Sequence, residues 1–244
     1  MDLRGRAAVV TAASRGIGRA IAIRLAEEGA DVVVNWRRDA EAAAETVRRI
    51  TDRGGNAVAV RADVAVREDV ARLFAAAREA FGGVDVVVGN AGHNIVGATA
   101  DLDEAEFDRV IAVNVKGMFL VLRQAAATVR DGGRIIIVSS GNTRATLPAT
   151  GVYAGTKAFA EQMGLALAKE LGPRQITVNS VLPGLTDTEG VRPDIRANAE
   201  EVIAMTPLGR MGRPEDIADV VAFLAGDDAR WVTGQRIGVS GGLA

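Results

Sequence analysis

Cysteine is absent from this chain of 244 residues, and histidine and tyrosine each occur only once, as His93 and Tyr153. Without cysteine there can be no disulfide, no thiolate zinc site, no iron–sulfur cluster and no cysteine nucleophile. A single histidine excludes a metal site built from several histidines. We therefore expect no bound metal.

A strong excess of charge and long apolar runs are also missing. The formal net charge is −2 at pH 7, so bulk electrostatics gives no reason to expect nucleic acid or an anionic membrane as a partner. No apolar run approaches the roughly 18 residues that span a bilayer. The stretch Ala7–Ala13 is short and is soon followed by Arg15, which fits a strand better than a signal peptide. The expected location is the cytoplasm.

The composition is typical of a folded globular chain. Hydrophobic residues make up 48% and charged residues 25%, which excludes a disordered or fibrous protein. Folds that mix helices and strands often reach about 250 residues as one domain. Because no linker, repeat or low-complexity tract interrupts the chain, we predict a single domain over residues 1–244.

Short β-branched runs alternate with longer segments of helical period. The predicted strands are Ala7–Thr11, Asp31–Asn35, Ala57–Arg61, Val84–Val88, Arg134–Ser139, Thr177–Val181 and Arg236–Val239. The predicted helices are Arg15–Glu28, Asp39–Arg53, Glu68–Phe81, Glu104–Arg130, Tyr153–Leu171 and Pro214–Ala225. Several strands are apolar almost throughout, which is typical of strands buried on both faces. The order predicts an α/β fold of Rossmann type, a doubly wound parallel sheet of about seven strands with helices on both faces.

The stretch 185–208 departs from this alternation. It is long, polar and interrupted by Pro193 and Pro207. Loops of this length in compact domains are usually lids or binding loops, so we predict a substrate lid. The alternative is a mobile surface loop.

A turn with two glycines joins the first strand to the first helix. Its sequence is Thr11-Ala-Ala-Ser-Arg-Gly16-Ile-Gly18. Glycines at such a turn let the backbone approach a pyrophosphate, whose charge faces the helix N-terminus. A merely structural turn is the alternative.

The segment after the second strand bears on the choice between NAD and NADP. Proteins that bind NAD usually place a carboxylate there, but this chain has Asn35-Trp36-Arg37-Arg38. A 2′-phosphate suits guanidinium groups, so Arg37 is the first candidate to bind it, Arg15 the second and Arg38 a third. The pattern favours NADPH. The alternative is that Arg37 and Arg38 are only a solvated helix start.

Polar side chains that could move a proton occur at three places. Tyr153 precedes Lys157 by four positions, so phenol and ammonium share one face of a helix. Ser140 follows a strongly apolar strand, at the carboxyl end where doubly wound sheets bind ligands. Asn114 lies within a predicted helix, where a polar amide needs a reason.

These residues together resemble the short-chain dehydrogenase/reductase family, in its branch that is similar to 3-oxoacyl-acyl-carrier-protein reductases. The motifs run through the whole chain in the family's order: the turn 11–18, Asn90-Ala91-Gly92, Asn114, Ser140 thirteen residues before Tyr153-x-x-x-Lys157, Ile176-Thr-Val-Asn179, Pro183-Gly184 with Thr188, Pro214-Glu-Asp-Ile217 and Thr233-Gly-Gln235. The spacing selects Ser140 over Ser139, and the alternative for Ser140 is a strand-end cap. One position departs from the family: Ala12 replaces its first glycine.

The resemblance implies an NADPH-dependent oxidoreductase that reduces a ketone, of the 3-oxoacyl-thioester type or another, to a secondary alcohol. Tyr153 would donate the proton, and Lys157 would favour the phenolate and hold the nicotinamide ribose. Ser140 would orient the substrate oxygen, and Asn114 would anchor a water in a proton relay. Two alternatives stay open: an NAD-dependent dehydrogenase of a sugar, polyol or other secondary alcohol, and a non-catalytic binding protein that senses the cofactor.

The resemblance also implies a homotetramer and a set of cofactor-binding residues. That set is Ser14, Arg15, Gly16, Ile17, Gly18, Arg37, Arg38, Asp63, Val64, Asn90, Ala91, Gly92, Tyr153, Lys157, Pro183, Gly184, Thr186 and Thr188. Asp63 is equally a candidate helix cap. His93 is a candidate for substrate contact, Trp36 for adenine stacking and Trp231 for an assembly contact, with packing or solvation as the alternative. Arg174 is a candidate for docking an acidic acyl carrier.

Overall fold

A single parallel sheet forms the centre of the molecule in the computed structural model, which describes residues 1–189, 191 and 199–244. Its strands are β1 (Ala7–Val10), β2 (Asp31–Trp36), β3 (Asn56–Arg61), β4 (Val86–Gly89), β5 (Arg134–Val138), β6 (Thr177–Pro183) and β7 (Arg236–Val239). They lie in the order β3-β2-β1-β4-β5-β6-β7, and every pairing is parallel. All seven predicted strands are confirmed, with ends shifted by one or two residues.

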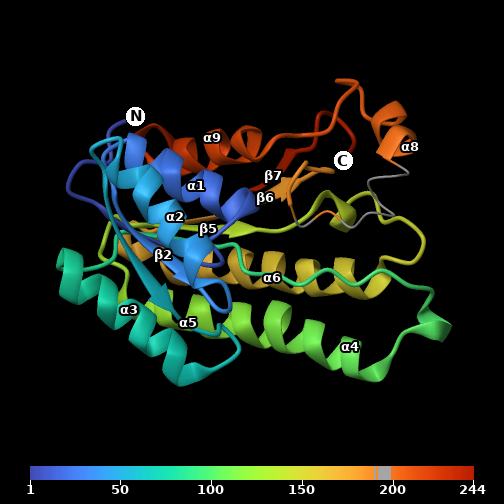
Figure 1. The fold of residues 1–244 in the computed structure, drawn as a ribbon, viewed down its shortest axis with the longest axis horizontal. Helices are drawn as coiled ribbons and strands as arrows, with labels where there is room; N and C mark the ends of the chain where they lie inside the picture. The colour runs from blue at the N-terminus through green and yellow to red at the C-terminus, as the bar shows by residue number, and fades with distance from the viewer. Residues whose placement is uncertain (190, 192–198) are drawn as a thin grey trace.

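Helices cover both faces of the sheet (Figure 1). One face carries α1 (Gly16–Glu27), α2 (Ala40–Thr51) and α9 (Pro214–Ala225). The other carries α3 (Arg67–Phe81), α5 (Met118–Thr128) and α6 (Gly151–Glu170). Successive strand residues alternate between the two cores: Ala8 and Val10 face the first set of helices, and Val9 faces the second. The strands are therefore buried on both sides, as their apolar sequences predicted.

The long predicted helix over 104–130 is present but is not regular. It consists of α4 (Glu104–Val110), a π-helical segment η2 (Ile111–Gly117) and α5. By length and composition alone, Glu104–Thr128 could cross a membrane, with a mean hydropathy of 1.4 in its most apolar window. Charged residues such as Lys116 and Arg123 interrupt this helix, so it is not the continuous apolar run that the sequence lacks. Of that window 44% is buried inside the protein, where α5 packs against α3 and α6.

The predicted lid, 185–208, is only partly covered. Residues 190 and 192–198, including Pro193, lie outside the described residues. The described part contains a short helix that the sequence did not predict, α8 (Ala199–Ala204). The two ends of the predicted lid are tied to the rest of the protein by backbone hydrogen bonds. The Gly212 N–H donates to the Leu185 carbonyl (2.9 Å), and the Leu208 N–H donates to the Gly241 carbonyl (3.1 Å).

The site is placed by the point at which the chain reverses its direction across the sheet. From β1 the chain runs outward through β2 to β3, and it then returns to β4 on the other side of β1. The connections that follow β1 and β4 therefore diverge and leave a crevice at the carboxyl ends of these strands. Ligands of doubly wound sheets bind at this point.

Ala12 carries backbone strain, since its φ of 51° lies in the left-handed region that a residue with a Cβ rarely adopts. We expect Ala12→Gly to raise the free energy of unfolding by about 1 kcal/mol, because glycine removes this steric cost. Urea denaturation measures the difference. The matched control is Ala13→Gly, at a fully buried neighbour where loss of a core methyl lowers stability. Equal destabilisation by both changes would contradict the assignment of strain to Ala12.

Candidate active site

The ends of β1 and β4 are joined by a closed set of hydrogen bonds. The Thr11 hydroxyl accepts from the backbone N–H groups of Asn90 (2.8 Å) and Ala91 (2.9 Å). In return, the Asn90 side-chain amide donates to the carbonyls of Thr11 (2.9 Å) and Ala12 (3.3 Å). This exchange holds the predicted cofactor-binding segment Asn90-Ala91-Gly92 against the turn that follows β1.

Two glycines let α1 begin directly at that turn. Gly16 has a φ of 53°, which glycine adopts without steric cost. A Cβ on Gly18 would lie 2.3 Å from the carbonyl oxygen of Ala12, so any side chain there would push α1 away from the turn. Glycine at both positions therefore keeps the N-terminus of α1 at the crevice.

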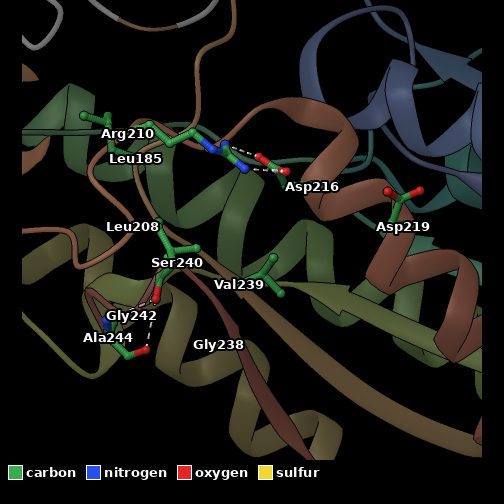
Figure 2. Close-up of a pocket in the computed structure, with 13 residues that line it drawn as sticks. Leu185, Leu208, Arg210, Asp216, Asp219, Gly238, Val239, Ser240, Gly242 and Ala244 are labelled. Atoms are coloured by element: carbon green, nitrogen blue, oxygen red, sulfur yellow. Dashed lines mark hydrogen bonds and ion pairs between the residues drawn. The ribbon is translucent and has the colours of Figure 1, made fainter.

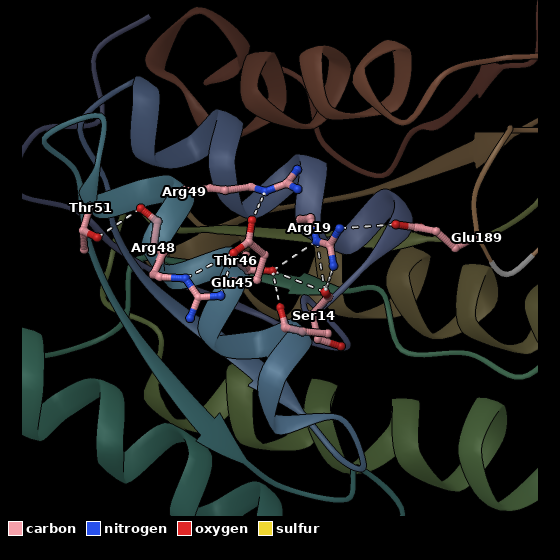
Figure 3. A network of polar contacts seen from close by, with 9 residues as sticks. Ser14, Arg19, Glu45, Thr46, Arg48, Arg49, Thr51 and Glu189 are labelled. Carbon is pink, nitrogen blue, oxygen red and sulfur yellow. Dashed lines mark hydrogen bonds and ion pairs between the residues drawn. The ribbon is translucent and has the colours of Figure 1, made fainter.

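A carboxylate lies at the N-terminus of α1 (Figure 3). Glu189 accepts a hydrogen bond from the Gly16 N–H at 3.2 Å, and its other oxygen lies 3.2 Å from Nη1 of Arg19. The Arg19 guanidinium is held in turn by the Ser14 carbonyl, at 2.6 Å from Nη2. Helix N-termini favour anions, and the described structure thus holds an anionic group where the sequence predicted a pyrophosphate.

Positive charge gathers at the ends of β2 and β3. The Arg61 guanidinium lies 5.8 Å from the centroid of the Trp36 ring, and its Nε donates to the Arg37 carbonyl at 3.3 Å. Arg37 pairs with Asp63 at 3.3 Å, and its side chain is 38% exposed. With Arg38 beside them, these groups form a basic, solvent-exposed surface next to the turn 11–18 between β1 and α1, called the dinucleotide turn below.

Tyr153 and Lys157 lie one helical turn apart on α6, beside the end of β5. The Lys157 ammonium is 5.8 Å from the centroid of the Tyr153 ring and donates to the Val138 carbonyl at 2.9 Å. Burial lowers the pKa of Lys157 to about 8, and Glu161 acts in the opposite direction. Burial raises the pKa of Tyr153, and its hydrogen bond with Ser140 opposes that shift. At pH 7 the lysine is therefore mostly charged and the phenol carries its proton.

The two serines after β5 have different partners. The Ser140 hydroxyl lowers the pKa of Tyr153, and its oxygen accepts from the Asn142 N–H at 3.2 Å. The Ser139 hydroxyl instead donates to the Glu161 carboxylate at 2.5 Å. Ser140 is thus the serine beside the phenol, the position that the thirteen-residue spacing selected.

Asn114 lies in the π-helical segment η2, and its side chain fixes the loop after β4. Its Oδ1 accepts from the His93 N–H at 2.7 Å, and its Nδ2 donates to the His93 carbonyl (2.9 Å) and to the Thr156 hydroxyl (3.0 Å). The His93 ring is 39% exposed and lies 3.4 Å from Glu106. Because the side-chain N–H groups of Asn114 are both used, its role as an anchor for a relay water stays a prediction.

The residues after β6 extend from the sheet to the dinucleotide turn. Gly184 donates to the Val239 carbonyl at 3.1 Å, and the Thr186 hydroxyl donates to the Gly184 carbonyl at 3.0 Å. Thr188 lies beside the start of α1, since a Cβ on Gly16 would be 3.4 Å from the Thr188 Cβ. This segment therefore borders the crevice where the sequence placed it.

A cavity of about 400 Å³ opens near the C-terminus (Figure 2). Tyr153 and Lys157 do not line it. Its ion pair, Arg210 with Asp216 at 2.6 Å, also caps α9, because Asp216 accepts from the Arg213 N–H at 2.6 Å. The charged groups of this ion pair therefore serve the fold.

Sequence reasoning missed three residues that the structure places at the site: Arg19, Arg61 and Glu189. Each could have been suspected only from its charge, because its partner lies far away in the sequence or on another strand.

Two of the predicted cofactor-binding residues differ in exposure. Val64 is buried in the core under α3 and α5, and Arg15 is exposed at the turn. Among the described residues, no cluster of three or more acidic or histidine side chains could hold a metal ion.

The chain is similar to known proteins over its whole length. A family model described as enoyl-(acyl carrier protein) reductase matches residues 11–244. An uncharacterised oxidoreductase of Methylorubrum extorquens is 46% identical over 244 residues, 99% of this chain and 98% of that protein. Versicolorin reductase 1 of Aspergillus parasiticus is 43% identical over 254 residues, 98% of this chain and 97% of that one. The solved structure of the landomycin C-6 ketoreductase LanV, with bound NADP and rabelomycin, is 43% identical with a TM-score of 0.91, covering 99% of this chain and 97% of that chain.

The Rossmann-type fold and these similarities define an oxidoreductase of a class that uses nicotinamide cofactors. The chain belongs to the short-chain dehydrogenase/reductase family, as the order and spacing of its motifs predicted. Its place in the branch of 3-oxoacyl-acyl-carrier-protein reductases stays a prediction.

We expect Glu189→Gln to tighten dinucleotide binding, because the carboxylate competes with phosphate for the Gly16 N–H and for Arg19. Glu189 is 59% exposed, so the gain should be modest, about two- to fivefold in Kd. Calorimetric titration with NAD⁺ and NADP⁺ measures it. Glu79→Gln, an equal charge change on α3, is the control. Weaker binding of both dinucleotides to the Glu189 variant would show that the carboxylate supports the turn instead of competing for it.

Proposed function

We propose that this protein is an NADPH-dependent ketoreductase that converts a ketone to a secondary alcohol by hydride transfer, with Tyr153 as proton donor. The observation that carries the proposal is the group at the end of β5, where the Lys157 ammonium lies 5.8 Å from the centroid of the Tyr153 ring and Ser140 lowers the pKa of the phenol. These side chains suit three tasks: to donate a proton, to stabilise the anion left behind and to orient a carbonyl. The names of several relatives, such as versicolorin reductase and tetrahydroxynaphthalene reductase, support reduction of the substrate as the direction of the reaction.

Each side chain has a separate task in this proposal. Bound NADPH supplies the hydride. As negative charge develops on the ketone oxygen, Tyr153 donates its proton to that oxygen. The Lys157 ammonium stabilises the resulting phenolate, and its burial strengthens this interaction because the surroundings screen charge poorly. Ser140 donates a hydrogen bond that orients the oxygen.

The residues present fit a dinucleotide at two places. The N-terminus of α1 already holds the Glu189 carboxylate, and Gly18 leaves the backbone close to that anion. Beyond β2, Arg37 and Arg38 suit a 2′-phosphate. Asn35 cannot take the part of a ribose-binding carboxylate, because it is buried and bonded to backbone groups of both neighbouring strand ends. These features support NADPH over NAD and disfavour the polyol dehydrogenase.

A ketone on a fused aromatic ring system is the substrate class that we propose to test first. The motive is the similarity to tetrahydroxynaphthalene reductase and to LanV, solved with rabelomycin bound. A carrier-bound 3-oxoacyl thioester comes second. Arg174, the candidate docking residue, donates to Asp131 and to two carbonyls at the end of α5, so its guanidinium serves the fold. A panel of aromatic ketones, quinones, β-ketoacyl thioesters and sugars, followed by NADPH absorbance, ranks these classes.

The homotetramer also belongs to the proposal. Phe107 on α4 is 40% exposed, Phe119 on α5 is 42% exposed and Trp231 is 95% exposed. Single exposed apolar side chains are common on monomers, so the tetramer rests on the family resemblance, and these three residues are where we expect its contacts.

Tyr153→Phe is expected to lower kcat by about 10²- to 10⁴-fold, the usual contribution of a general acid. NADPH binding should stay nearly intact, because only the phenolic hydroxyl is lost. Stopped-flow reduction and NADPH fluorescence titration measure the two quantities. Retention of more than a few per cent of kcat would remove Tyr153 from the mechanism.

Arg37→Asp is expected to reverse or strongly reduce a preference for NADPH, because it removes the phosphate partner and adds a ribose acceptor. Loss of one charge-assisted contact corresponds to roughly 10- to 100-fold in affinity, towards the lower end here because Arg37 is partly exposed. The ratio of kcat/KM for NADPH and NADH should change more than in Arg37→Ala. Arg48→Asp on α2 is the control for net charge. A wild type that prefers NADH would refute the phosphate site.

A further inference from the structure

The strongest unexplained feature is a second ionisable side chain buried behind the tyrosine and lysine. Glu161 is 2% exposed, and Lys157, four residues before it on α6, is 5% exposed. Residues four apart lie on the same face of a helix, so Tyr153, Lys157 and Glu161 form one column along α6. A buried carboxylate is costly unless a cation or hydrogen-bond donors compensate it.

The end of β5 holds the charged groups of Lys157 and Glu161 at consecutive residues. The carbonyl of Val138 accepts from the Lys157 ammonium at 2.9 Å. The hydroxyl of the next residue, Ser139, donates to the Glu161 carboxylate at 2.5 Å. The end of β5 therefore anchors the cation and the anion at neighbouring residues.

The external anchor of Glu161 is weaker. Arg236 on β7 lies 3.5 Å from the second carboxylate oxygen, and the Arg236 side chain is 45% exposed. An ion pair open to water is strongly screened. Arg236 thus compensates the buried carboxylate only in part. Lys157 is the buried cation on the same helix face, beyond ion-pair distance from Glu161 but near enough for the carboxylate to act on its pKa.

We propose that Glu161 is a positioning residue for the reaction: its buried carboxylate, anchored by Ser139 and Arg236, is the counter-charge that keeps Lys157 in the ammonium form beside Tyr153. The proposal rests on the proposed function for its catalytic meaning. Burial lowers the pKa of Lys157, and Glu161 is the group that opposes this shift. Lys157 is faced by Tyr153 and Glu161 on α6, and Arg236 on β7 lies behind Glu161. Arg144 lies further out and donates to the Arg236 carbonyl.

The charge of Lys157 can be measured without turnover. The chain has three lysines, at positions 116, 157 and 169. Lysine labelled with ¹³C at the ε-carbon should give three signals in the full-length protein without cofactor. Lys116→Arg and Lys169→Arg identify the Lys157 signal, and the other two signals serve as internal controls.

Two variants separate the charge of Glu161 from its shape. Glu161→Gln keeps the size and still accepts from Ser139, but it removes the charge. The titration midpoint of Lys157, which we expect near pH 8 in the wild type, should fall by about one pH unit or more, a tenfold loss of proton affinity. Glu161→Asp keeps the charge and should retain most of the wild-type midpoint. Urea denaturation of both variants checks that they fold.

The outcomes are distinct. A lower midpoint in Glu161→Gln alone supports the proposal. An unchanged midpoint, or an equal fall in both variants, overturns it, because packing would then explain the residue. The pH at which kcat declines on the alkaline side should move with the midpoint. If the midpoint moves and the kcat profile does not, Glu161 keeps Lys157 charged as proposed, but Lys157 does not take the proposed part in catalysis.

Discussion

The architecture of the site depends on the hydrogen bonds that tie the end of β1 to the end of β4. Thr11 and Asn90 close this junction, and the chain leaves it in two directions, into the dinucleotide turn and into the loop that reaches His93. Asn114 holds that loop and also bonds to Thr156 on α6. A continuous series of polar contacts therefore links the turn at α1 to the helix that carries the tyrosine.

Electrostatics divides the crevice into two regions with different surroundings. The region at α1 and β2 is open to water, and its cations are partly exposed arginines, which suit phosphate groups that arrive with their own hydration. In the region at β5 and α6 the cation is a buried lysine, and a buried charge is costly without an internal partner. Binding and chemistry thus use opposite degrees of solvation within one crevice.

The sequence predicted the sheet and its order of elements well, because strands buried on both faces leave continuous apolar runs and each helix ends near glycine. It also placed Ser140, Tyr153 and Lys157 at one end of the sheet. It did not reveal the π-helical segment around Asn114, because the apolar pattern of a helix hardly changes when one turn widens. Nor did it reveal the contact of Glu189 with Gly16, since the two lie 173 positions apart and nothing in the sequence around Glu189 points to the turn.

The π-helical segment has a consequence for insertions and deletions. A π turn contains more residues than an α turn, so η2 accommodates extra chain between α4 and α5 without displacing either end. Deletion of one residue there would restore a regular helix with α4 and α5 still aligned, but it would change the directions in which the side chains of η2 point. The apolar pattern would survive in large part, while Asn114 would lose its alignment with His93. The number of residues between the two helices, and not their composition, sets the alignment of the site.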